Sequence, residues 1–302
     1  MFLDIKVPSF NATLMGIVRG VADYYGLTYS DAQLYGLSGH AFMINIHDSL
    51  CASGPYCWKR QPFYDALLNT GIRMDEGQFI DSNITQNERN KIEASLISRL
   101  DRGELCGFVN LEYQLITGYD ETGFITTQPW TGIDYPPGHL AFSSWQEFGK
   151  EIHVNFFTFD KTEPAPEKTA IIAGLRFARD QADRASACSE AKYHTGPGAF
   201  DTWITAVEAG HGDGHGNRWN GMVWAECRQF AARYCHELAD KYPETASLAD
   251  GIRFGYQIIA DNLLKVSDKK LDAAAKIRLL REAKLHEQDC LDQMDHFIEA
   301  LS

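Results

Sequence analysis

The segment EYQLITGYDETGFITTQPW, Glu112–Trp130, is the clearest indication of a sheet, because apolar residues alternate here after a long stretch of helical periodicity. Two runs rich in β-branched and aromatic residues flank Gly118–Asp120, which is typical of strands joined by a turn. We expect two strands around a turn that begins at Gly118. Leu105–Leu111 and Glu151–Phe159 have the same character. The sequence therefore predicts a small antiparallel sheet.

Helical patterns dominate the chain before this sheet. Ala12–Gly26 has apolar residues at spacings of three and four, and Gly26 is placed as a C-terminal cap. Ser30 or Asp31 is expected to cap a second, short helix. Asn87–Gly103 predicts an amphipathic helix with charges on its outer face. We also expect an apolar strand within Gly39–Cys51 and a helix in Gln61–Ile72.

A domain boundary is expected after the sheet. Asp160–Lys168 contains two prolines and five charged residues but no large apolar group, which is typical of a linker. We expect domains at 1–160 and 169–302, joined by the linker 161–168. Three polar breaks after Thr169 predict about five helices, and hence a helical bundle. The expected fold class is α+β: helices against a small antiparallel sheet, followed by an all-α domain.

Composition excludes several kinds of partner and site. The formal charge of −13, without a basic patch, argues against nucleic acid and anionic membranes as partners. No apolar run approaches the roughly 20 residues that span a bilayer, and the N-terminus lacks a signal-peptide pattern, so we expect a cytoplasmic protein. The seven cysteines include no CxxC pair. We therefore expect reduced thiols, no cofactor and no metal site.

Several motifs together resemble papain-like cysteine peptidases. The resemblance depends on two motifs, YYGLTYSDAQLYGLSG at Tyr24–Gly39 and GYD at Gly118–Asp120. The order of the expected elements also matches over roughly residues 5–158. The resemblance is to the bacteriocin-leader-processing branch and to the N-terminal domain of butirosin biosynthesis protein H. It implies a papain-like fold with a nucleophilic Cys opening the first long helix, a His shortly before GYD, and an Asp before a proline. The implied activity is peptide cleavage or acyl transfer from a carrier protein.

The residues at the triad positions differ from those that the family uses. Alignment on the motifs places Thr13 at the Cys position, Glu112 or Tyr113 at the His position, and Gln128 at the Asp position. Without an imidazole base, a threonine hydroxyl is a poor nucleophile. We therefore expect a site that binds a peptide or a small molecule in the ancestral cleft, and whether any enzyme activity remains stays open. Further expected ligand contacts are Asn11, Trp130 and His194.

Two alternatives remain open. Cys51 with His40 or His47 could provide thiol chemistry at a second site, although Cys51 does not begin a long helix. The helical domain could instead dock a partner, such as a carrier protein or a second copy in a homodimer. The glycine-rich loop His211–Trp219 is interpreted as a connection between helices rather than a metal site.

Overall fold

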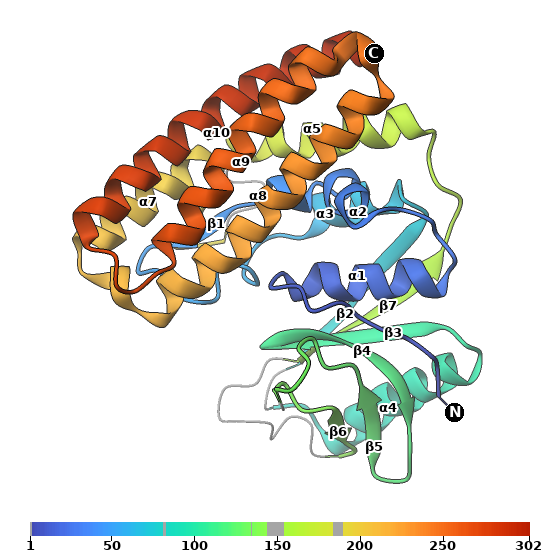
Figure 1. Cartoon of the computed structure of the whole chain (residues 1–302). Helices are drawn as coiled ribbons and strands as arrows, with labels where there is room; N and C mark the ends of the chain where they lie inside the picture. Colours follow the sequence, from blue (N-terminus) through green and yellow to red (C-terminus); the bar gives the residue numbers. More distant parts are fainter. Residues whose placement is uncertain (1, 81–82, 134, 144–153, 184–189) are drawn as a thin grey trace. The chain divides into compact units, whose positions relative to one another are not determined.

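The computed structural model describes residues 2–80, 83–133, 135–143, 154–183 and 190–302 (Figure 1). The chain is α+β, as expected, with an antiparallel sheet and a series of long C-terminal helices. None of the helices in these ranges combines the length and hydropathy that a bilayer-spanning segment needs. The chain divides into two compact units, each built from two stretches of sequence.

Ser30–Thr70 belongs to the same unit as the C-terminal helices. The first unit consists of Met1–Tyr29 and Gly71–Glu163, and the second of Ser30–Thr70 and Pro164–Ser302. The later division falls inside the expected linker. The grouping of Ser30–Thr70 has a physical cause, since its apolar side chains pack on the helices: the Tyr35 ring stacks on Phe230 with centroids 4.2 Å apart. Sequence order alone does not reveal this packing.

The first unit contains a six-stranded antiparallel sheet in the order β2-β7-β3-β4-β5-β6. The strands are β2 (Ile72–Ile80), β3 (Leu105–Asn110), β4 (Glu112–Tyr119), β5 (Gly123–Thr126), β6 (His139–Ala141) and β7 (Val154–Lys161). The expected strands in the Leu105–Trp130 region are confirmed. The strand predicted from Glu151 begins, in the described residues, at Val154, and 151–153 lie outside the described residues. β7 runs into the predicted linker as far as Lys161.

The prediction that the central turn begins at Gly118 is wrong. β4 continues to Tyr119, and Gly118 pairs with Ile125 of β5. The turn is made by Asp120, whose Oδ1 accepts hydrogen bonds from the backbone N–H groups of Thr122 and Gly123 at 2.7 and 3.1 Å. An aspartate that bonds the backbone ahead of it competes with strand pairing, so the carboxylate fixes the turn two residues later.

Two helices cover opposite faces of this sheet (Figure 1). Leu96 and Leu100 of α4 (Gln86–Asp101) pack in one cluster with Cys106 and Phe108. α1 (Thr13–Tyr24) contacts β4 on the other face, where a Cβ on Gly20 would lie 3.1 Å from a methyl carbon of Leu115. Because side chains alternate across a strand, Cys106, Phe108 and Ile116 join the α4 cluster, whereas Leu115 of β4 lies against α1.

The second unit consists of helices and one short two-stranded sheet. Ser30 caps α2 through a capping box with Gln33, which confirms the predicted cap. A Cβ on Gly36 would lie 2.1 Å from the Tyr234 ring, so only glycine allows α2 to approach α8 this closely. The helices and strands are α2 (Asp31–Leu37), β1 (Asn45–His47), α3 (Gln61–Leu68), α5 (Glu167–Asp183), β8 (Tyr193–Thr195), α7 (Pro197–Glu208), α8 (His215–Lys241), α9 (Ala246–Val266) and α10 (Ala273–Leu301).

A buried ion pair links three elements of the second unit. Arg228 of α8 makes two hydrogen bonds to the Glu287 carboxylate of α10, at 2.9 and 2.7 Å. Its Nη1 also donates to the backbone carbonyls of Ala41 and Met43 at 3.0 and 2.8 Å. Both ionic side chains are almost completely buried. Since the arginine is satisfied on every side, it connects the segment before β1 to the helical bundle.

Candidate functional site

Thr13 is the first residue of α1, at the position where the family pattern has its nucleophile. Ala12 precedes the helix and offers no side-chain cap. The Thr13 side chain does not cap the helix either. Its hydroxyl crosses to β4 and donates to Oε2 of Glu112 at 2.7 Å. The structure thus brings together two of the residues predicted for the site, although they lie 99 positions apart in sequence.

The Thr13 hydroxyl is held from two sides. It accepts a hydrogen bond from the backbone N–H of Tyr113 at 3.2 Å while it donates to Glu112. The side chains of Thr13 and Glu112 are almost fully buried, at 3% and 6% exposure. The carboxylate lies beside the start of α1, where the positive end of the helix dipole stabilises negative charge. This arrangement fixes the hydroxyl and explains how a carboxylate is tolerated there.

Tyr113 serves the site through its backbone. Its side chain is 1% exposed and stacks on Phe157 of β7, across the intervening strand β3, with ring centroids 5.8 Å apart. The sequence left the histidine position open between Glu112 and Tyr113. In the structure it is the side chain of Glu112 that reaches Thr13.

The remaining predicted residues of this unit lie on the connections around the pair. Gln128 donates through Nε2 to the carbonyl of Pro136 at 3.3 Å, and Trp130 donates through Nε1 to the carbonyl of Phe10 at 3.3 Å. The carbonyl of Asn11 accepts the backbone N–H of Thr13 at 3.1 Å. Trp130 therefore ties the chain just before α1 to the segment after β5, whereas the Asn11 contact is local to the start of the helix.

Tyr135 was not predicted as a site residue, but the negative charge of Glu112 affects its hydroxyl. Burial and, after it, the negative charge of Glu112 raise the pKa of the Tyr135 hydroxyl above its ordinary value. The side chain is nevertheless 43% exposed. The partly exposed Tyr135 side chain therefore lies near enough to Glu112 for the carboxylate to affect its ionisation.

Gln114 is the buried polar residue that sequence reasoning missed. Its Nε2 donates to Thr126 Oγ1, to the Thr127 carbonyl and to the Pro137 carbonyl at 3.0, 2.8 and 2.9 Å. The side chain is 1% exposed. These bonds hold the segment after β5 against β4, two residues from Glu112. The available signal was a polar residue within a predicted strand, which did not indicate its hydrogen-bond partners.

The backbone immediately before Glu112 is unusual. Leu111 has φ 67°, a left-handed conformation that β-branched and bulky residues rarely adopt, and it separates the paired residues Asn110 and Glu112. Its side chain is 60% exposed. This one-residue connection between β3 and β4 sets the point at which Glu112 enters the sheet.

The structure pairs His40 with a cysteine other than Cys51. His40 Nδ1 lies 3.6 Å from the sulfur of Cys227, and aromatic rings including Trp58 and Phe63 surround the imidazole. Burial, assisted by the charge of Arg228, lowers the pKa of His40 to about 3, and burial raises the pKa of the Cys227 thiol. Both groups are therefore neutral at pH 7, which does not produce a thiolate nucleophile.

Cys51 lies at the surface of the second unit. It is an exposed free cysteine, and its carbonyl accepts a hydrogen bond from Asn220 Nδ2 at 2.9 Å. Within the described part of the chain, no hydrogen bond joins its thiol to His40. His47 instead bonds Ser49 through Nδ1 at 3.0 Å.

The other predicted histidines also belong to the second unit. His194 of β8 contacts Asp48 through Nε2 at 2.8 Å and is about half exposed. The His211 loop forms a short 3₁₀ turn, where the buried Lys276 amine donates to Asp213 Oδ1 at 2.9 Å. Among the described residues, no group of three or more His, Cys, Asp or Glu side chains has an arrangement that could hold a metal ion.

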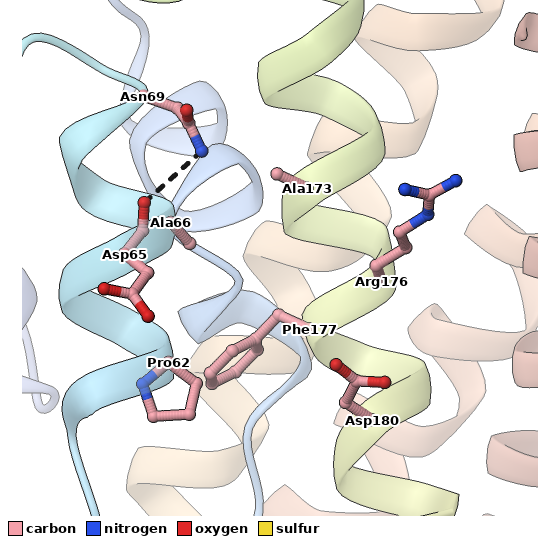
Figure 2. A pocket seen from close by; sticks show the side chains of 8 residues that line it. All are labelled: Pro62, Asp65, Ala66, Asn69, Ala173, Arg176, Phe177 and Asp180. Atoms are coloured by element: carbon pink, nitrogen blue, oxygen red, sulfur yellow. Dashed lines mark hydrogen bonds between the residues drawn. The ribbon is translucent and has the colours of Figure 1, made fainter.

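A shallow cavity of about 210 Å³ lies between α3 and α5 of the second unit (Figure 2). Its walls carry Asp65 and Asn69 on one side and Arg176 and Asp180 on the other, with the Phe177 ring between the two helices. None of the residues predicted for the site lines this cavity. It combines charges of both signs and gives no indication of a particular ligand.

No protein-family model matches the chain, and a search of curated proteins finds no match.

Proposed function

We propose that the first unit is a papain-like unit in which a Thr13–Glu112 pair replaces the thiolate–imidazole pair, and that it binds a peptide or small molecule without thiol chemistry. The observation that carries the proposal is the 2.7 Å hydrogen bond from the Thr13 hydroxyl to Glu112. It joins the start of the first long helix to the strand before the GYD turn. These are the two positions from which the family pattern draws its nucleophile and its base.

The chemistry of the pair favours binding over covalent catalysis. A papain-like mechanism needs a thiolate and a histidine that shuttles a proton. A hydroxyl keeps its proton at neutral pH, and a carboxylate is a much weaker base than an imidazole. In addition, the Tyr113 N–H and the Glu112 carboxylate hold Thr13 Oγ1 in a fixed orientation. The resulting site presents negative charge rather than a nucleophile.

The charge of Glu112 indicates which part of a ligand the site would hold. Carboxylates bind cations that also donate hydrogen bonds, and an ammonium group combines both properties. The half-exposed ring of Tyr135 and the exposed side chain of Leu111 offer apolar surface near this charge. The proposed ligand is therefore a peptide amino terminus or another primary amine with an apolar neighbour.

The absence of thiol-type chemistry can be tested with p-nitrophenyl acetate as an acyl donor. We expect no acetylation of Thr13 in the wild-type protein by mass spectrometry. The double variant Thr13→Cys/Glu112→His should be acetylated on its new thiol, because an imidazole now faces a thiol at the helix start. The matched control is Thr13→Cys alone, which should react much more slowly since the carboxylate disfavours a thiolate. An acetylated wild-type Thr13, or a double variant no faster than the control, would contradict the proposal.

Binding can be tested with a pair of probes that differ only in the charged amine. Leucinamide should shift the backbone NMR signals of Thr13 and Tyr113, and N-acetyl-leucinamide should not. Glu112→Gln keeps the size of the side chain and an acceptor oxygen but removes the charge, so it should weaken leucinamide binding at least about tenfold. Equal responses to both probes would rule out recognition of the ammonium group.

A further inference from the structure

The outer face of α10 carries a charged stripe with an apolar residue at its centre. Arg278, Arg281, Leu285, Asp289 and Asp292 are all exposed, and they follow one another at intervals of three or four residues. Residues at this spacing lie on one side of an α-helix. α10 packs against α9, α7 and α5 through its other sides (Figure 1). Leu285, at 68% exposure, therefore stands in the middle of an unpartnered helix face.

The stripe is symmetric about Leu285, with the sign of the charge reversed. Arg281 and Asp289 are each four residues from Leu285, or about 6 Å along the helix axis. Arg278 and Asp292 are each seven residues away, or about 10 Å. If two copies of α10 lie antiparallel with a twofold axis at Leu285, each arginine faces an aspartate of the other copy.

The charges on this stripe differ from those on the inner sides of the same helix. Lys284 pairs with Asp201, Asp295 pairs with Arg179, and Glu287 pairs with Arg228. In contrast, the four charged residues of the stripe form no ion pair with any described residue of the chain. Asp292 accepts only the amide of Gln288, one turn earlier on the same helix, at 3.2 Å. The helix therefore satisfies its inward charges within the unit and presents its outward charges to an external partner.

We infer that a second copy of this chain docks on α10 in an antiparallel, twofold-symmetric helix pair. The occupant is a second copy because the stripe is complementary to itself: the same five residues supply both sides of the contact. Such an isologous interface is the commonest form of homodimer. Leu285 packs against its symmetry mate, and four arginine–aspartate contacts flank this centre, two on each side.

Sedimentation equilibrium of the full chain tests the inference through charge reversal. The wild type should be a dimer in solution. Arg281→Glu places like charges opposite each other twice and should raise the dimer dissociation constant at least about tenfold. Adding Asp289→Arg in the same chain restores opposite charges only if residue 281 faces residue 289 of the partner. The double variant Arg281→Glu/Asp289→Arg should therefore recover most of the wild-type affinity.

The matched control is Arg176→Glu, which makes the same charge change on the exposed side of α5. It should leave the dissociation constant within about twofold of the wild type, since Arg176 lies on another helix, at the cavity between α3 and α5, and is not part of the stripe. A monomeric wild type would overturn the inference. So would a charge-swapped double variant that stays as weak as Arg281→Glu, or an Arg176→Glu variant as weak as Arg281→Glu.

Discussion

The two units each bury a carboxylate that joins distant segments, but the two carboxylates have different donors. Glu287 in the second unit receives both charge and hydrogen bonds from Arg228, whose remaining donors reach the carbonyls of Ala41 and Met43. Glu112 in the first unit accepts from Thr13, a hydroxyl that donates a hydrogen bond but brings no charge. Burial alone therefore does not show what a carboxylate does, because these two buried carboxylates accept from donors of different chemistry.

The largest expected effect is at the ion pair of the second unit. Arg228→Met leaves the Glu287 carboxylate buried without its cation, and we expect a loss of about 3–5 kcal/mol in the free energy of unfolding. Urea unfolding measures this loss. The double variant Arg228→Met/Glu287→Leu should recover most of it, because an apolar pair of similar volume is often as stable as the ion pair. If Arg228→Met lowered the free energy of unfolding by less than about 1 kcal/mol, as for a surface ion pair, the Arg228–Glu287 pair would not be a main support of the second unit.

His40 should make the stability of the second unit depend on pH. Its folded pKa of about 3 lies below the ordinary histidine value of about 6.5, so between these values only the unfolded state binds the proton. Stability is therefore full above pH 7 and falls as the pH drops, until the loss ends below the folded pKa. Between pH 7 and 5 we expect a decrease of about 2 kcal/mol from this residue.

Urea unfolding at both pH values, for wild type and His40→Gln, isolates the histidine contribution. The glutamine variant cannot titrate here, so the stability gap between the two proteins should change by the same 2 kcal/mol or so in favour of the variant as the pH falls. A constant gap would mean that protons reach His40 in the folded state. The aromatic enclosure around His40–Cys227 would then be more open than its burial indicates.

The sequence predicted much of the first unit because its signals are local. The apolar spacing of Ala12–Gly26 determines structure within a few residues of itself, as does the capping residue Ser30 at the start of the second unit, and both predictions are confirmed. β2 was missed for a physical reason. It is an edge strand, and the alternation of buried Ile72 and Met74 with exposed neighbours ends after two turns of the pattern, at Glu76 and Gly77. Its pairing partner, β7, comes after β3 to β6 in the sequence, so no local pattern indicates the pairing.

The candidate site was predictable only where a family pattern supplied the spacing. Motif order placed Thr13 and Glu112 at corresponding positions, and the structure brings their side chains together. No local signal could pair His40 with Cys227, since 187 positions separate them and helix packing decides the contact. Likewise, nothing in the strand pattern showed that Gln114 anchors the segment after β5. Side-chain partners across long loops depend on tertiary packing, which periodicity does not encode.

The smallest expected effect on stability is at the Thr13–Glu112 pair itself. Thr13→Val keeps the shape of the side chain but removes the hydroxyl, so Glu112 loses a donor and the Tyr113 N–H loses an acceptor. We expect a loss of about 1–2 kcal/mol in the free energy of unfolding, since two hydrogen bonds near a helix end are affected. Urea unfolding measures it, and Thr13→Ser, which keeps the hydroxyl, is the matched control with a loss below about 1 kcal/mol.

The size of this loss decides how far the two carboxylates differ. A pair whose role is ligand binding should contribute little to the stability of its unit. We therefore expect Thr13→Val to lower the free energy of unfolding much less than Arg228→Met does. Loss of leucinamide binding in Glu112→Gln, with stability close to that of the wild type, would place the role of the carboxylate in recognition. If Thr13→Val instead destabilises as strongly as Arg228→Met, the Thr13–Glu112 pair mainly holds α1 to β4. The buried carboxylate would then have a structural role in each of the two units.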